Sequence, residues 1–474
     1  MNVGLCVSSL LIVSILYGII NVFSVQKQQT LYLLKKSFSF CSVVFALLAL
    51  ELGGSMMLGT CEQAYSMGLF GLLYVVGITV GFLLLGFGFA SKMKAMNVES
   101  TIDLFAIKYH SPFIRSSAAI LSILTTSGLL IGQIVAAKSL VYALGIHNDF
   151  IFIALCLAVV AYTIWGGLKG AGITYSAQLI YTIILFGAIF GFCIFKEPPS
   201  FFYNFLSHQN LFTSNTISFS AIFASLVMPA LYYLTDQEFA KPLFAITTKK
   251  EAALCTISAS FFMLLFSFIP IYLGIKAKAL NLCIGDNVSP LIAVLQILTN
   301  NIVVGLAVCG VAAALIAMID YYLWAVSLSI TYEIGLAHPA FADNKTFEKT
   351  MVVIIGVIAI GASYCTKSDA IAVLLYSYEL YDSCLIVPLV MSYFQADLKK
   401  GSAIGAFLFG LTSFILFRFI TIPIPQQVAS LSLSLLGFYL GGIIEKLVSN
   451  FNKGQILLSL YSRLQRYNWN HRIH

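Results

Sequence analysis

Charged side chains are scarce in this sequence: 9% of the residues are Asp, Glu, Lys or Arg, whereas 60% are hydrophobic. A soluble globular domain carries roughly 25% charged residues. The composition therefore excludes a soluble globular protein. The mean hydropathy of +0.95 is that of a chain lying mostly in lipid. The lipid bilayer is therefore the first partner that the sequence predicts.

Residues in the patterns that enzymes and metal centres need are also lacking. The 10 cysteines are scattered without metal-ligand spacing, and the 6 histidines fall in loops or the tail. No glycine-rich phosphate loop follows a strand, which excludes an ATPase domain. No nucleophile and base converge on one segment. We expect no enzyme, no metal cofactor or other cofactor and no nucleic-acid partner.

Long apolar runs fill the chain instead. Segments of about 20 residues span the hydrocarbon core of a bilayer, and about thirteen follow one another between Asn2 and Leu447. The first, Gly4 to Phe23, lacks the basic start and cleavage site of a signal peptide, so we expect it to be retained. The predicted spans are residues 2–22, 39–64, 67–91, 115–145, 150–168, 174–195, 217–236, 251–275, 301–333, 349–366, 368–395, 401–420 and 427–447.

The positions of the basic residues predict the topology, and they account for the net charge of +7 without an anionic partner. Lysines and arginines gather after the odd-numbered spans, as the positive-inside rule requires of cytoplasmic loops. We expect an outside N-terminus and a cytoplasmic C-terminus. Residues 448–474 form a basic amphipathic tail, which we expect on the inner membrane surface.

Two of the spans are interrupted inside their apolar stretch. Gly53, Gly54, Ser55 and Gly59 break the second span, and Pro229 breaks the seventh. Irregular backbone at membrane depth is tolerated where it is buried in protein or lines a cavity. Paired broken helices are typical of secondary transporters made of two inverted repeats. A pair of packing kinks is the alternative. We expect repeats over residues 39–195 and 217–395, with peripheral helices over residues 401–447, in one transmembrane domain over residues 1–447.

Several motifs resemble the sodium/solute symporter family, which includes carriers for proline, pantothenate and glucose. They occur in the family's order and spacing along most of the chain. The matching segments are Gly53-Gly54-Ser55 with Ala64-Tyr65 and Gly68 to Gly71, Thr101 to Phe105 with Arg115, Tyr162 to Leu168 with Thr174 and Gln178, Asp236-Gln237, and Ala313 to Asp320.

The resemblance implies an all-α, leucine-transporter-type fold that works by alternating access and carries a small polar solute. It also implies a sodium site made by backbone oxygens at Gly54, Met57 and Ala314 and by two hydroxyls where this chain has Ala317 and Met318. Neither Ala317 nor Met318 has an oxygen in its side chain, and sodium needs oxygen ligands. Carboxylates that family members carry are absent too, since Met56 and Tyr175 stand at their positions.

Ionisable residues inside the spans are the candidate proton carriers. A charge centred in the bilayer costs about 2.5–3.5 kcal/mol on insertion scales, so each should face protein or water. Glu51 lies next to the first break and is the strongest candidate for carrying a proton. A packing role, hydrogen-bonded to the freed backbone, is its alternative. Asp320, Glu379 and Asp382 are the others, and Lys138 is expected to reach toward the outer surface.

Three mechanisms follow for a carrier of this kind. Proton coupling predicts that Glu51→Gln abolishes accumulation, residual sodium coupling predicts sodium-dependent uptake, and uncoupled facilitation predicts equilibration with neither ion. A membrane sensor with this fold is the rival function. It would signal through an attached domain, and none follows Leu447 in the sequence.

Overall fold

The computed structural model describes residues 40–89, 101–196, 219–236, 243, 248–282, 289–337, 344–366, 369–395, 398–420 and 422–470. Its regular elements there are all helices. The chain divides into two compact units, Met1–Thr101 with Ala119–Tyr381, and Ile102–Ala118 with Asp382–His474. The expected first span, residues 2–22, lies outside the described residues.

Eight helices in the described part of the chain are long and apolar enough to cross a membrane, and three shorter apolar helices accompany them. Many apolar side chains on these helices are exposed, including Phe150 at 86% and Phe195 at 91%. Exposed apolar side chains in such numbers suit a lipid solvent. The chain is therefore a multi-pass integral membrane protein, while the total of about thirteen spans stays a prediction.

The first predicted break is present, slightly earlier than the glycines indicated. Helix α2 (Phe40–Ala49) ends before residues 50–53, and α3 (Gly54–Met67) begins after them. Gly53 has extended backbone, and Gly54 to Gly59 are helical. The glycines serve close packing here, because a Cβ on Gly54 would collide with the Leu315 side chain and the Val311 carbonyl.

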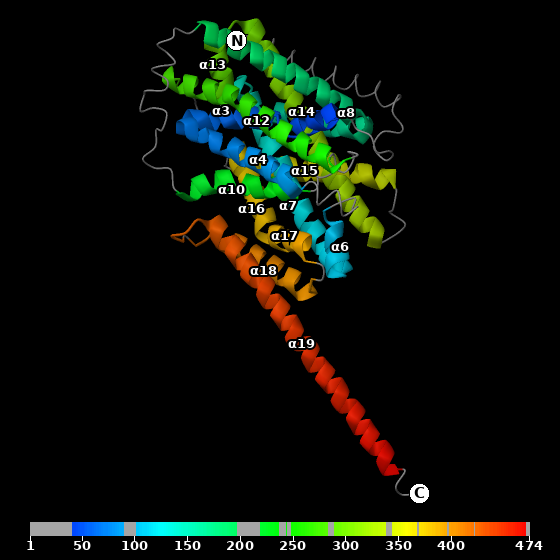
Figure 1. Cartoon of the computed structure of the whole chain (residues 1–474). Coiled ribbons are helices and arrows are strands. Elements are labelled where there is room, and N and C mark those ends of the chain that lie inside the picture. The colour runs from blue at the N-terminus through cyan, green and yellow to red at the C-terminus, as the bar shows by residue number, and fades with distance from the viewer. Residues whose placement is uncertain are drawn as a thin grey trace. The chain divides into compact units, whose positions relative to one another are not determined.

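Helices α3 and α4 (Leu72–Leu84) form a hairpin against α12 (Lys249–Ala279), as Figure 1 shows. The turn between them is a 3-10 helix, η1 (Gly68–Gly71), and Gly68 has φ +66°, which favours glycine. A π-helix, η2 (Leu85–Phe89), extends α4. Near one end of α12, Gly274 packs on Cys61 and Ala64, and its other end meets Gly86.

The second predicted break is not at Pro229, so that prediction was wrong. Helix α10 (Phe219–Thr235) runs through Pro229 and packs along α4. A proline inside a helix cannot donate to the carbonyl four residues earlier, here Ser225. Gly77 of α4 lies directly against the Ser225 and Leu226 carbonyls. A neighbouring helix thus covers the place where the proline weakens α10.

The expected fifth and sixth spans are joined in the structure. A single helix, α8 (Asp149–Lys196), covers both, and it packs along α14 (Asn301–Ala337) and α15 (Lys345–Cys365). Helices α8 and α14 run antiparallel, because Tyr181 donates to the Leu306 carbonyl (2.9 Å) and Trp324 donates to the Thr163 carbonyl (3.2 Å). The short helix α13 (Pro290–Leu298) packs on α3, α12 and α14.

Two further helices complete the first unit. Helix α7 (Pro112–Ala143) begins in the second unit, and its part from residue 119 on packs on α16 (Ala370–Tyr381) through Gly128 and Gly132. Those glycines meet Ser377 and Leu374 of α16. Helix α16 also packs on α3 and α10, so it reaches the region of the first break.

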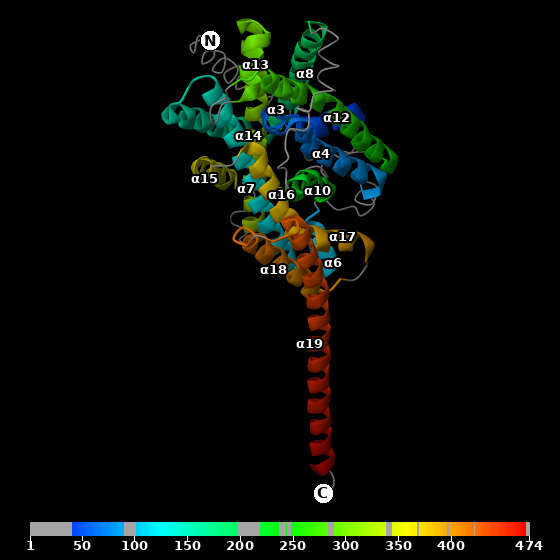
Figure 2. The ribbon, with the colours of Figure 1, turned by 90° about the vertical axis from the view of Figure 1, so that its left-hand side faces the viewer.

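The second unit contains α6 (Asp103–Tyr109), the π-helix η5 (Asp382–Ile386), α17 (Val387–Phe394), α18 (Lys400–Leu416) and α19 (Gln426–Asn470). An ion pair between Arg115 and Asp103 (3.0 Å) and a hydrogen bond from Tyr109 to the Pro388 carbonyl (2.8 Å) order its start. Glycines of α18 and α19 face each other, which brings the two backbones close. Figure 2 shows α19 as one straight helix, which includes most of the predicted tail.

Candidate functional site

Glu51 lies in the irregular stretch between α2 and α3. The Gly53 amide there donates to the Glu51 carbonyl (2.6 Å), so the chain makes a tight turn before α3 begins. The Glu51 side chain is 7% exposed and hydrogen-bonds Tyr233 of α10. The break therefore turns a carboxyl group toward α10.

A chain of tyrosine hydroxyls continues from Glu51. The Tyr233 hydroxyl lies 3.1 Å from that of Tyr378 in α16, and the Tyr378 hydroxyl lies 3.2 Å from that of Tyr74 in α4. All three side chains are buried. One hydrogen-bonded network thus joins the break to three helices.

A second carboxyl group lies beside this network. Tyr232 donates to Asp236 at the end of α10 (3.0 Å), and Asp236 is 2% exposed. The Tyr232 ring lies 4.4 Å from the Tyr378 ring and 5.2 Å from the Tyr381 ring, measured between centroids. Asp236 also interacts electrostatically with Glu51. We call Glu51, Asp236 and Tyr74, Tyr232, Tyr233, Tyr322, Tyr378 and Tyr381 the tyrosine–carboxyl cluster.

Basic residues do not pair with Glu51 in the part of the chain that the structure describes. The ion pair found there joins Arg115 to Asp103. Among the described residues, Lys276 is the sole buried basic side chain. It lies just after Gly274, which packs on Cys61 and Ala64, far along α3 from the break. Glu51 is therefore a buried acid among hydroxyls and another acid.

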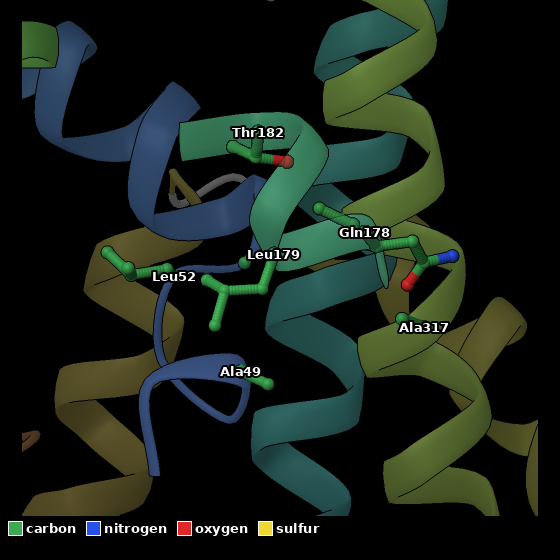
Figure 3. A pocket seen from close by; sticks show the side chains of 8 residues that line it. Ala49, Leu52, Gln178, Leu179, Thr182 and Ala317 are labelled. Atoms are coloured by element: carbon green, nitrogen blue, oxygen red, sulfur yellow. The ribbon is translucent and has the colours of Figure 1, made fainter. Parts of the chain in front are cut away.

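The opposite side of the break faces α8 and α14, and a cavity of about 10 Å³ lies there. Ala49, Leu52 and Gly53 line it from the break, Gln178, Leu179 and Thr182 from α8, and Ala314 and Ala317 from α14. Figure 3 shows the Gln178 amide extending toward α14, where Ala317 lies. The amide of Gln178 and the hydroxyl of Thr182 are buried and have no hydrogen-bond partner.

The positions expected to hold sodium meet around this cavity. Gly54 packs on α14 at Val311 and Leu315, and Gly53 lies against the Met318 side chain. Ala314, Ala317, Met57 and Met318 are buried.

The side chains here offer sodium few oxygens. Those that line the cavity supply only the Gln178 and Thr182 oxygens, and the side chains of α14 contribute methyl groups. A hard cation needs a shell of oxygens, which these side chains alone do not make. The volume is about that of one water-sized sphere, so the site suits a water molecule.

The remaining predicted residues are distributed around the two units. Asp320 is buried in α14, and Ser55 and Gly59 are buried in α3. Glu379 is buried in α16, and Asp382 begins the π-helix η5. The Lys138 ammonium lies 3.8 Å from the centre of the Tyr364 ring, a cation–π contact. Its expected reach toward the outer surface stays a prediction.

Four residues of these regions escaped the sequence reasoning or received no role in it. Tyr74, Asp236 and Thr182 were not candidates, although Asp236 belongs to a motif that we quoted. Glu62 of α3 is a partly buried acid near Asp369, and it was not counted among the charges in the spans. An acid or hydroxyl within an apolar span was the available signal for each of them.

Solved structures share this architecture over nearly the whole chain. A Na+-coupled sialic acid symporter in a substrate-bound outward-open state matches with a TM-score of 0.72 and 16% identity, covering 94% of this chain and 97% of that one. Mhp1, a nucleobase-cation-symport-1 family transporter in a closed conformation, matches with a TM-score of 0.54 and 14% identity over 88% and 94% of the two chains. MhsT in complex with L-phenylalanine matches with a TM-score of 0.53 and 12% identity over 87% and 99%.

No family model matches the sequence. The structural likenesses show the fold, which is the all-helical, leucine-transporter-type fold that the sequence predicted. The class defined by fold and composition is thus a multi-pass membrane protein built like a secondary transporter.

Proposed function

We propose that this protein is a secondary transporter that moves a small polar solute by alternating access. The observation that carries the proposal is the interrupted helix at residues 50–53, which turns buried Glu51 toward the Tyr233 hydroxyl within a transporter fold. Irregular backbone at membrane depth is typical of a carrier's binding site. The motifs and the neighbour's description as a symporter support a relation to sodium/solute symporters.

The coupling ion that we propose is the proton. A buried carboxyl group that lacks a cationic partner is stable mainly when it is protonated or when a cation arrives. Glu51 meets this description, and the side chains at the sodium positions do not make an oxygen shell. Coupling to protons is therefore favoured over coupling to sodium.

The hydroxyl network gives Glu51 a means of controlling conformation. Tyr233 belongs to α10, Tyr378 to α16 and Tyr74 to α4, so a change in the charge of Glu51 alters a bond shared by these helices. A change of protonation can then bias an equilibrium between two packings of the helices. The carboxyl group holds the proton, and the tyrosines transmit its effect.

The test uses the full chain in liposomes that contain a pH-sensitive dye. A panel of neutral, anionic and cationic small solutes is added in sodium and in potassium buffers. We expect at least one solute to change the internal pH equally in both buffers, and Glu51→Gln to abolish that response. Uptake that requires sodium would overturn the proton as coupling ion, and no transport of any solute would overturn the transporter.

Orientation and membrane need a separate test. We propose an outside N-terminus and a cytoplasmic C-terminus, because lysines and arginines gather after odd-numbered spans. We propose the bacterial inner (plasma) membrane because the motifs resemble those of sodium/solute symporters. A reporter fused to the C-terminus in bacteria should be active only on the cytoplasmic side.

A further inference from the structure

We propose that the transported solute is an organic cation that competes with a proton for Glu51. This inference rests on the proposed function and names the substrate class of the same site. Binding of the cation then releases the proton, so the protein exchanges one for the other.

The charges of the tyrosine–carboxyl cluster carry the first part of the argument. Glu51 faces Tyr233 and Asp236 of α10, and it interacts electrostatically with Tyr74 of α4 and Tyr378 of α16. All of these groups are acidic or neutral at physiological pH. A solute carboxylate or phosphate would add like charge beside Glu51, whereas an ammonium or guanidinium group would give Glu51 the positive partner that no described residue provides.

The arrangement of the tyrosine rings carries the second part. Tyr232 and Tyr233 meet at 88°, Tyr232 and Tyr381 at 78°, and Tyr233 and Tyr378 at 66°. In this conformation the edge of one ring meets the face of the next, so the faces become free for a ligand when the rings separate. Faces of several aromatic rings around one point are the recognised way to bind an alkylated ammonium group.

The tyrosines come from helices of both predicted repeats. Tyr74 lies in α4, Tyr232 and Tyr233 in α10, and Tyr378 and Tyr381 in α16. Tyr322 of α14 interacts electrostatically with Tyr232, Tyr233 and Tyr378. The rings contact one another in this conformation, with 4.4 Å between Tyr232 and Tyr378. A cation therefore enters when α10 and α16 part, which is the motion that alternating access supplies.

A proton and a monovalent cation that compete for one carboxyl group are exchanged one for one. With the proton on Glu51, the oxygens of the carboxyl group are neutral and attract a cation weakly. When the proton leaves to water, the carboxylate binds the cation, and the net charge at the site is unchanged. Each crossing thus carries one proton or one monovalent cation, and the two move in opposite directions.

The test measures binding to the purified full-length protein by calorimetry at mildly alkaline and mildly acidic pH. Choline, guanidinium and ethylammonium are the cationic probes, and 3,3-dimethyl-1-butanol is the uncharged counterpart of choline. We expect at least one cation to bind, with affinity falling about tenfold per unit fall in pH where the proton dominates. The uncharged counterpart should not bind.

Two matched variants separate the site from general effects of removing an acid. Glu51→Gln keeps the shape and should abolish binding of the cation at both pH values. Glu62→Gln removes an acid farther along α3 and should bind as the natural protein does. Melting curves of both variants check that they are folded.

Several results would overturn the inference and leave the proposed transporter standing. Binding of 3,3-dimethyl-1-butanol as tight as that of choline would show that charge is irrelevant. Affinity that is independent of pH, or retained by Glu51→Gln, would place the cation elsewhere. No binding of any of the three cations, while a neutral or anionic solute moves protons in liposomes, would assign another substrate class.

Discussion

Polar side chains are buried on both sides of the break between α2 and α3, but they are hydrogen-bonded to one another on one side only. Toward α10 and α16, Glu51 and the hydroxyls of Tyr74, Tyr233 and Tyr378 satisfy one another. Toward α8 and α14, the Gln178 amide and the Thr182 hydroxyl are buried beside a small cavity without partners. The expected ion site lies on the second side, and the connected network lies on the first.

This difference between the two sides favours one of them as the place where ion and solute movements are coupled. A connected network of buried hydrogen bonds responds to the charge of any member, whereas isolated groups beside methyl side chains do not. The side chains of Ala314 and Ala317 contribute to the cavity no group that could titrate or bind an ion strongly. We therefore propose that Glu51 and its tyrosines carry the coupling, and the variants below test that proposal.

The largest effect is expected from Glu51→Gln, which keeps the shape of the side chain and removes its titration. Solute-driven pH change in liposomes should fall to the level of liposomes without protein. Exchange of labelled solute across the membrane should persist if the solute binds without Glu51, and it should vanish if the solute is a cation held by that carboxylate.

Glu62→Gln is the control for that loss, because Glu62 lies on α3, the helix that follows Glu51, and outside the tyrosine–carboxyl cluster. Its pH response should equal that of the natural protein. An equal loss in both variants would contradict a specific role for Glu51.

A large effect on stability is expected on the cavity side from Gly54→Ala. The new methyl group would meet the Val311 carbonyl at 2.8 Å as well as the Leu315 side chain, and a helix backbone yields little. Overpacking of this kind costs about 1–3 kcal/mol, so the melting temperature should fall. Gly191→Ala is the matched control, because no atom lies within 4 Å of its added methyl group. Equal melting temperatures for the two variants would show that α3 and α14 are not tightly packed.

A smaller loss is expected from Tyr378→Phe on the network side. The change removes a hydroxyl that meets both Tyr74 and Tyr233, and the loss of a hydrogen bond costs about 0.5–1.5 kcal/mol. Tyr376→Phe, on the same helix and 45% exposed, should leave the melting temperature unchanged. If Tyr378→Phe melts no lower than Tyr376→Phe, the hydroxyl network contributes nothing to stability.

The sequence was sufficient to locate the break but not its surroundings. Glycines within an apolar run indicated irregular backbone near Gly53, and the composition and motifs predicted the fold. Pro229 was misread because the helix tolerates it through contact with Gly77, a residue distant in the sequence. Neither composition nor local spacing can identify such a neighbour.

The burial of individual tyrosines could not be predicted from the sequence either. Tyr376 and Tyr378 are two residues apart and looked equivalent, yet the first is 45% exposed and the second 2%. Helix orientation decides which of them enters the core, and that orientation depends on how α16 packs on α3, α7 and α10. Tyr74 and Asp236 became functional candidates only when that packing was known.

The smallest effect is expected from Thr182→Val, which removes the unpartnered hydroxyl beside the cavity and preserves the shape. The hydroxyl has no hydrogen-bond partner to lose, so its removal should not lower the free energy of unfolding.

The natural protein should melt at the same temperature in sodium as in potassium, because a cation at about one hundred times its dissociation constant would add roughly 2.7 kcal/mol. A sodium-specific rise that Thr182→Val abolishes would show that α8 replaces the oxygens missing from Ala317 and Met318. Coupling would then belong to the cavity side of the break, and the contrast between the two sides would be reversed.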